Sequence, residues 1–310
     1  MTVSARVLVP IEIANAMISA GTTIAEPDTA IGESAWVSAG TYALDTEKTY
    51  GGSIWYCVTA HSGRTGTPDI DAAYWKRIGP TNRMAALDDY NTTKSRATAA
   101  LTFVLQPGFF NGIALYGLEG SGYAITVKDA PGGTVISASS GDLYAQAAGF
   151  YELLFSPLLQ MEQLSFDDVP LAPAAEVTIT ITSGPGKPVA IGAIKVGDWR
   201  QFIGDGSGGV QYGAESNRKT YTFRQYNLDG TYTMVKRPSS RDIQCSVVID
   251  ADQSMYASAI LDEIIDTAVP FEATGLPRYG YLNTLGFVSG GVRADNFGVT
   301  SINLQIKGNV

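Results

Sequence analysis

The sequence has few of the residues on which most catalytic and metal sites depend. Its 310 residues include one histidine, His61, and two cysteines, Cys57 and Cys245. His61 lies in a polar, turn-like stretch beside Ser62, and neighbouring residues cannot bring together the three groups of a nucleophilic triad. The cysteines are far apart in the sequence and are flanked by strand-like residues, so buried free thiols are favoured over a disulfide. We therefore expect no catalytic residue and no metal site.

Charge is also scarce, and its sign excludes some partners. Charged residues make up 16% of the chain, and the formal net charge is -9. Because phosphate binding requires a cationic surface and no run of lysine or arginine is present, nucleic acid is not an expected partner. No apolar segment approaches the length of a membrane span. Because Pro10 interrupts the first apolar run, the N-terminal segment makes a poor signal peptide. We expect synthesis in a bacterial cytoplasm and no membrane insertion.

What the chain does contain favours β-structure. Hydrophobic residues make up 45% of the sequence, which is ample for ordinary globular cores, and Gly, Thr, Ser, Val, Ile and Tyr are prominent. The expected fold is mainly β, with a small three-stranded aromatic module, a central antiparallel β-sandwich of jelly-roll-like form, and a C-terminal β domain with one packed helix. The expected parts are an N-terminal arm (1–27), the module (28–80), a linker (81–100), the sandwich (101–196) and the C-terminal domain (197–310).

Local patterns place individual elements within this plan. The run from Val177 to Thr182 alternates without error, so one face of that strand should be buried. The Asp229-Gly230 pair predicts the tip of a β-hairpin. Apolar residues at helical spacing around Ile260 predict the packed helix. The apolar N-terminal arm must pack on its own C-terminal domain or on an adjacent subunit, since contiguous exposed apolar surface is rare.

The most informative stretch runs from Trp36 to Arg83 and holds three of the four tryptophans. A unit this short must use a few large rings as its core. In a strand, Trp55 and Tyr56 cannot both point inward, and the same holds for Tyr74 and Trp75 if that pair is extended. The outward rings suit a sugar or a partner protein, and the alternative is that they pack on the rest of the chain or on a neighbouring subunit. The candidate contact residues, about half of which must be core, are Trp36, Tyr42, Trp55, Tyr56, Tyr74 and Trp75.

The same stretch resembles two known kinds of sequence. The first is the small three-stranded carbohydrate-binding module of the chitin- and cellulose-binding type, through Trp36, Tyr42, Trp55-Tyr56, Pro68 and Trp75-Lys76-Arg77-Ile78-Gly79. The second is a run in tail proteins of bacteriophages, where such a module precedes β-rich domains, through Gly79-Pro80-Thr81-Asn82-Arg83-Met84-Ala85-Ala86-Leu87-Asp88-Asp89. Residues 105–108 and 111–115 and the alternating C-terminal segments also resemble that family. The chain departs from it at Met84 and Leu87, where larger aromatics are usual.

This resemblance implies a structural protein of a phage tail, at the baseplate or tail tip, that contributes to host attachment through its aromatic module. The implied location is the virion, and the implied partners are other tail and baseplate proteins and host cell-surface polysaccharide. Sugar contacts through stacked rings are individually weak, so several copies would have to act together. One alternative is an assembly adaptor whose aromatic face holds a neighbouring tail or fibre protein without binding sugar.

A second alternative is a polysaccharide depolymerase, because glycosidases use two carboxyl groups. The adjacent pairs Asp88-Asp89 and Asp167-Asp168 are the candidates, and the sequence places neither across a cleft. The run from Gly204 to Gly209 fits the dinucleotide pattern G-x-G-x-x-G, but a β-like segment follows it where a helix is required. We expect no enzymatic activity and no cofactor.

Overall fold

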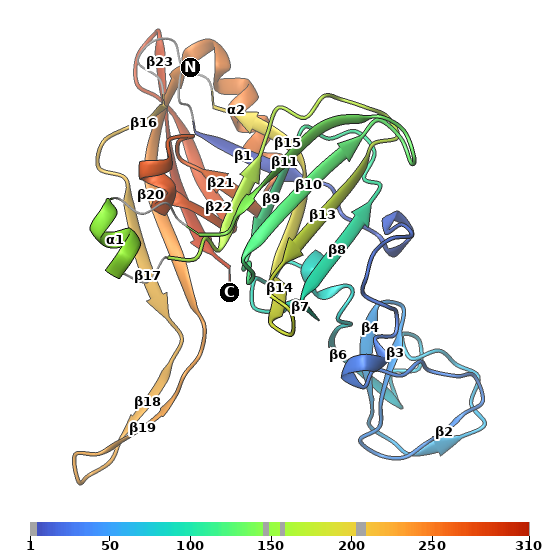
Figure 1. Cartoon of the computed structure of the whole chain (residues 1–310). Coiled ribbons are helices and arrows are strands. Elements are labelled where there is room, and N and C mark those ends of the chain that lie inside the picture. Colours follow the sequence, from blue (N-terminus) through green and yellow to red (C-terminus); the bar gives the residue numbers. More distant parts are fainter. Residues whose placement is uncertain (1–4, 145–148, 156–158, 203–208, 310) are drawn as a thin grey trace.

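A computed structural model of the chain describes residues 5–144, 149–155, 159–202 and 209–309. The protein is mainly β, as predicted, and most of its strands belong to two sheets (Figure 1). The glycine-rich run 204–208 lies outside the described residues. The larger sheet contains, in order, β12 (Gln163–Phe166), β9 (Gly112–Tyr116), β15 (Ala193–Gln201), β1 (Arg6–Pro10), β21 (Ala268–Glu272), β22 (Asn283–Ala294), β23 (Val299–Gly308), β20 (Ser239–Asp250) and β16 (Gly209–Val210), with β17 (Glu215–Thr220) also paired to β20.

The N-terminal segment lies in the middle of this large sheet. β1 pairs with β15 on one side and with β21 on the other. Val7 and Leu8 are fully buried and contribute to different apolar clusters, as expected for neighbours on opposite faces of a strand. The predicted arm therefore packs within its own chain. The predicted boundary at 196/197 falls inside β15, so the sheet is continuous between the sandwich and the C-terminal part.

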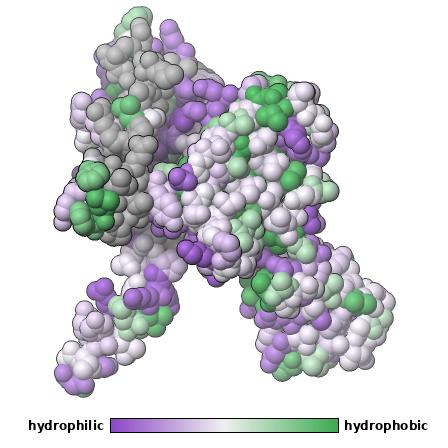
Figure 2. Space-filling view, viewed as in Figure 1, coloured by the Kyte–Doolittle hydropathy of each residue, from purple (hydrophilic) through white to green (hydrophobic). Residues whose placement is uncertain are grey.

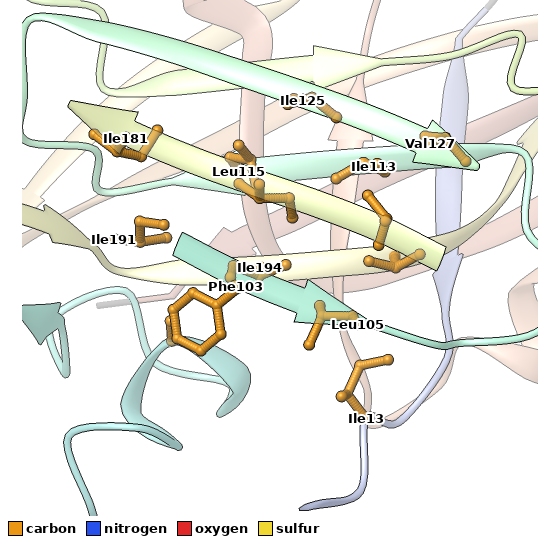
Figure 3. Close-up of a cluster of buried hydrophobic side chains, with 14 of the residues drawn as sticks. Ile13, Phe103, Leu105, Ile113, Leu115, Ile125, Val127, Ile181, Ile191 and Ile194 are labelled. Carbon is orange, nitrogen blue, oxygen red and sulfur yellow. The ribbon is translucent and has the colours of Figure 1, made fainter. Parts of the chain in front are cut away.

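The smaller sheet forms the other layer of the sandwich. Its strands, in order, are β11 (Val135–Asp142), β10 (Gly122–Lys128), β13 (Glu176–Thr182) and β8 (Ala100–Leu105). As the alternation predicts, Val177, Ile179 and Ile181 of β13 are fully buried. They meet Ile113 and Leu115 of β9 in the main core, part of which is drawn in Figure 3. A separate pair, β7 (Ser95–Thr98) and β14 (Pro188–Ile191), lies beside this sandwich.

The C-terminal part has its own core against one face of the large sheet. The predicted helix is present as α2 (Ser254–Glu263), and its buried residues Ala257 and Ile260 pack on the strands. A second, short helix, α1 (Phe150–Phe155), was not predicted. No described helix has the length and apolar character that a bilayer crossing requires. The 3-10 helices are η1 (Asn15–Met17), η2 (Thr29–Ile31), η3 (Ala85–Leu87), η4 (Ala251–Gln253) and η5 (Pro277–Leu282).

Two structures project from this body on the same side, the aromatic module and a long hairpin (Figure 1). The hairpin consists of β18 (Phe223–Tyr226) and β19 (Tyr232–Val235), and its turn contains the predicted Asp229-Gly230 pair. The hairpin continues from β17, which pairs with β20, and the module is joined to the body by a hydrogen bond from Asn82 to Asp28. The direction in which each projection leaves the body is therefore fixed.

The predicted linker at 81–100 is an ordered junction between module and body. Asn82 is buried, and its side-chain nitrogen donates to Asp28 at 2.7 Å and to the Arg96 carbonyl at 2.9 Å. The Asn82 amide oxygen accepts from the Arg96 N–H at 2.8 Å. Met84 and Leu87 pack against the main core. The module is therefore held to the sandwich by partly buried hydrogen bonds.

Candidate functional site: the aromatic module

The module is built on a three-stranded antiparallel sheet with a second short strand pair. Gly51 and Gly52 both have positive φ, 59° and 75°, and join β3 to β4 by a tight two-residue turn. Such a turn needs left-handed backbone at both positions, which glycine adopts without strain. The strands are β3 (Glu47–Tyr50), β4 (Ser53–Cys57) and β6 (Trp75–Pro80) in the sheet, and β2 (Thr41–Tyr42) with β5 (His61–Ser62) in the pair.

Two of the six candidate contact residues form the module's core. Tyr42 is 6% exposed and Trp75 is 2% exposed, and both pack with the buried Cys57. The two rings meet edge to face at 5.0 Å between centroids. The Tyr42 hydroxyl donates to the Val37 carbonyl at 2.8 Å and accepts from the Val37 N–H at 2.7 Å. Tyr42 and Trp75 therefore hold the module together and are removed from the set that can contact a ligand.

The neighbours Trp55 and Tyr56 lie on opposite faces of β4, as the strand period predicts. Trp55 packs on the core cluster, whereas the Tyr56 hydroxyl donates to the Asp45 carboxylate outside it. That hydrogen bond raises the pKa of the Tyr56 phenol. The second neighbouring pair differs, because Tyr74 precedes β6 and packs on the same cluster as Trp75. Tyr74 and Trp75 are not both in an extended strand, so the expectation that they point to opposite faces does not apply to them.

His61 has a structural role that the sequence did not suggest. Instead of lying on a polar loop, it pairs with Tyr42 across β2 and β5. Its ring lies 5.0 Å from the Tyr74 ring and 5.4 Å from the Trp75 ring, centroid to centroid. The Arg64 guanidinium lies 3.9 Å from the Tyr74 ring centroid. Tyr74 is thus contacted by an imidazole and a cation, which reduces the ring area open to a ligand.

The remaining rings define what we call the aromatic face, made up of Trp36, Tyr50 and Trp55, all of which are half-buried. The Trp36 and Tyr50 rings meet edge to face at 5.5 Å. The Trp55 indole N–H donates to the Tyr50 carbonyl at 3.0 Å. The polar edge of the indole is therefore satisfied, and the ring plane is the part of the side chain that could stack on a ligand. Tyr50 was not among the predicted residues. Tyr50 lies two residues after Lys48 on β3 and therefore on the same face of the sheet as Lys48 and its partner Trp55. This alternation could have identified Tyr50 from the sequence.

Cationic side chains flank the aromatic face in the cross-strand row. Lys48 on β3 and Arg77 on β6 are the direct partners of Trp55. Lys48 donates to the Ser34 hydroxyl at 2.9 Å, and Arg77 donates to the Ser53 hydroxyl at 2.9 Å. A half-exposed indole between hydrogen-bond donors can stack on the apolar face of a sugar while the donors reach its hydroxyl groups.

Three of the four carboxylates considered for glycosidase chemistry have other partners. Asp88 accepts one hydrogen bond from the Thr93 hydroxyl and one from the Tyr90 N–H, and Asp89 forms an ion pair with Lys195 at 2.7 Å. Asp167 forms an ion pair with Arg6. A cleft of about 740 Å³ between sandwich and C-terminal strands is lined by other residues, including Glu272, which also pairs with Arg6. Within the described ranges, no group of three or more His, Cys, Asp or Glu side chains is placed to hold a metal ion.

Comparison with known proteins found no matching family model, no matching curated protein and no matching solved structure.

Proposed function

We propose that the protein is a structural component of a phage tail, at the baseplate or tail tip, and that its module contributes to attachment to host-surface glycans. The observation that carries this proposal is the aromatic face of a module that stands off from the body (Figure 1). Trp36 and Trp55 offer ring surface, and Lys48 and Arg77 supply donors beside it. The role is binding without catalysis, and it resides in the virion, where other tail proteins surround the chain.

The ordered junction supports this role. Because Asn82 joins the module to the sandwich through partly buried hydrogen bonds, many copies fixed in one particle would present their aromatic faces in a constant direction. Constant geometry raises the effective concentration of the second and later contacts. Weak single-site sugar binding then becomes useful adhesion.

The test is binding of the full-length chain, displayed in many copies on beads, to intact host cells and to arrayed chitin and cellulose oligosaccharides. Trp55→Ala should weaken binding on the order of tenfold per site, the loss expected for one stacked ring. Phe109→Ala is the matched control, since Phe109 is an exposed aromatic on the sandwich. A folded wild-type protein that binds none of these surfaces contradicts the glycan proposal.

A second candidate function is an assembly adaptor that uses the module without sugar. Aliphatic side chains are exposed around the module, which a protein partner would cover and a sugar would not require. These are Ile31, Val37, Leu44, Ile70 and Ile78. For the adaptor, Ile78→Asp should abolish capture of a neighbouring tail protein, whereas glycan binding should be retained if the aromatic face is the sugar site.

A further inference from the structure

The hairpin arm, residues 218–237, is a structure without a core. Among the described strands, β18 and β19 pair only with each other, and every residue of both is exposed. Figure 2 shows the arm as a narrow extension below the body. An isolated two-stranded hairpin is marginally stable in water at best. The arm therefore requires a second surface to become fully ordered.

Apolar side chains occupy both faces of the arm. Phe223 lies opposite Val235 on one face, and Tyr226 lies opposite Tyr232 on the other. The two tyrosine rings are 6.0 Å apart, and Tyr226 is 72% exposed. Leu228 stands fully exposed at the tip. Exposed apolar side chains on each face of the arm give it surface that a partner can cover.

The charge of the arm is opposite to that of the rest of the chain. Residues 218–237 contain five basic side chains and one acidic side chain, a net charge of +4 within a chain of -9, which leaves -13 for the remainder. The basic residues are Arg218, Lys219, Arg224, Lys236 and Arg237. Complementary charge of this kind favours contact between the arm of one copy and the body of another.

One region of the body combines the required features, and we call residues 250–266 together with Phe297 the acidic pole. The segment 250–266 contains five acidic residues and no basic residue. Met255 on α2 is 81% exposed, and Phe297 is fully exposed. The Ala251 N–H donates to the Gly298 carbonyl at 3.2 Å, which brings the Phe297 turn beside the start of α2. The exposed acidic side chains are Asp252, Asp262, Glu263 and Asp266.

The arm and the acidic pole cannot meet within one molecule. β20 is 12 residues long, and it begins where the arm ends and finishes where the pole begins. At about 3.3 Å per residue, the two surfaces lie roughly 35–40 Å apart at opposite ends of that strand. Figure 1 shows α2 and the β18–β19 tip at opposite ends of the molecule. Contact between them has to join two copies.

We propose that the hairpin arm of one copy docks on the acidic pole of a second copy of this chain. Each copy then has one arm and one pole engaged with different neighbours, which is a heterologous contact. Repeating such a contact gives a closed ring if the rotation between successive copies returns to the first copy, and an open filament if it does not. The aromatic face takes no part in it, so this inference is independent of the proposed glycan binding.

The first test measures self-association of the full-length protein by sedimentation velocity over a range of concentrations. Wild type should form a concentration-dependent series of assemblies that dissociates at high salt. The arm variant K236E/R237E and the pole variant D262K/E263K should each weaken association by at least tenfold. The two changes combined in one chain should restore it, because the charges are complementary again. Lys187→Glu, on an exposed turn of the sandwich, is the control and should associate like wild type.

Three results would overturn the proposal. These are a wild type that remains monomeric at every concentration, a combined variant that fails to reassociate although each variant is folded by circular dichroism, and assembly that is lost on nuclease treatment. The last result would identify nucleic acid as the occupant of the arm.

A second test does not depend on charge reversal. Tyr232→Cys in one preparation and Met255→Cys in another should form a disulfide-linked dimer only when the two are mixed under oxidising conditions. The native Cys57 and Cys245 are buried and should not interfere. Replacing Met255→Cys by Leu171→Cys, at an exposed site on the sandwich side, should give no cross-link. Equal cross-linking to both positions would contradict a specific arm-to-pole contact.

Discussion

The two projections of this protein treat their aromatic residues in opposite ways. The module encloses Tyr42 and Trp75 in a small core and leaves Trp36 and Trp55 half-buried above it. The arm has tyrosines of the same kind, Tyr226 among them, with no interior to receive them. A sheet of three strands with a covering loop can form a core, whereas two strands cannot. The comparison teaches that the aromatic content of a segment does not show whether its rings form a core or remain exposed on a surface.

The largest expected effect comes from removing the central ring of the module. Trp75→Ala should destabilise the module by about 3–5 kcal/mol, since it deletes a fully buried aromatic side chain and leaves a cavity. Limited proteolysis of the full-length protein should then cleave within residues 28–80 while the sandwich stays intact. If the module of this variant resists protease as well as wild type does, Trp75 is not its core.

The next effect concerns the junction that fixes the module in place. Asn82→Ala removes hydrogen bonds to Asp28 and Arg96 and leaves partly buried polar groups of the junction without these partners. We expect a loss of about 2–3 kcal/mol in the free energy of unfolding of the region, measured by denaturant titration. Gln225→Ala in the exposed arm is the control and should change stability little. Equal effects of the two substitutions would show that the junction is no better ordered than the arm.

A smaller effect at the same junction depends on pH. Burial, with the neighbouring Glu33, raises the pKa of Glu26, although the Thr81 hydroxyl donates to its carboxylate at 2.7 Å. A carboxyl group with a raised pKa in the folded state favours folding most at low pH. That stability is lost as pH rises from the ordinary value of 4.5 through the folded-state pKa. Glu26→Gln should therefore flatten the dependence of the melting temperature on pH across this window, and an unchanged profile would contradict the assignment.

The smallest effect is expected in the arm. Tyr226→Ala should change the free energy of unfolding of the dilute monomer by less than about 0.5 kcal/mol, as for ordinary surface substitutions. The same variant should weaken self-association, because the ring is covered only in the assembly. A clear fall in the melting temperature of the monomer would instead show that the arm packs on its own chain.

Much of the fold could be predicted because local patterns encode it. Alternation identified β13, the Asp-Gly pair placed the hairpin turn, and helical spacing located α2. The position of β1 between β15 and β21 could not be predicted, since pairing over some two hundred residues leaves no local period. The segment 81–100 reads as a polar linker because its buried groups, such as Asn82, are satisfied by partners distant in sequence.

The placement of the aromatic rings in the module was predicted in part, whereas their contact with a ligand stays a prediction. The period of β4 separated Trp55 from Tyr56 as expected. The burial of Tyr42 and the packing of His61 depend on β2 pairing with β5, which brings together two strands of two residues each. Strands that short give no usable alternation. Sequence alone could therefore state that some rings are core without stating which.

The central claim is that the module has its own core, whereas the hairpin arm is covered only when copies associate. Hydrogen exchange of the full-length protein, measured by mass spectrometry at low and at high protein concentration, tests this claim most directly. The account predicts that amides of β4 in the module are protected at both concentrations. Amides of β18 and β19 should exchange rapidly in the dilute protein and become protected as copies associate. Arm amides that are already slow at the lowest concentration, or that stay fast when copies associate, would contradict it.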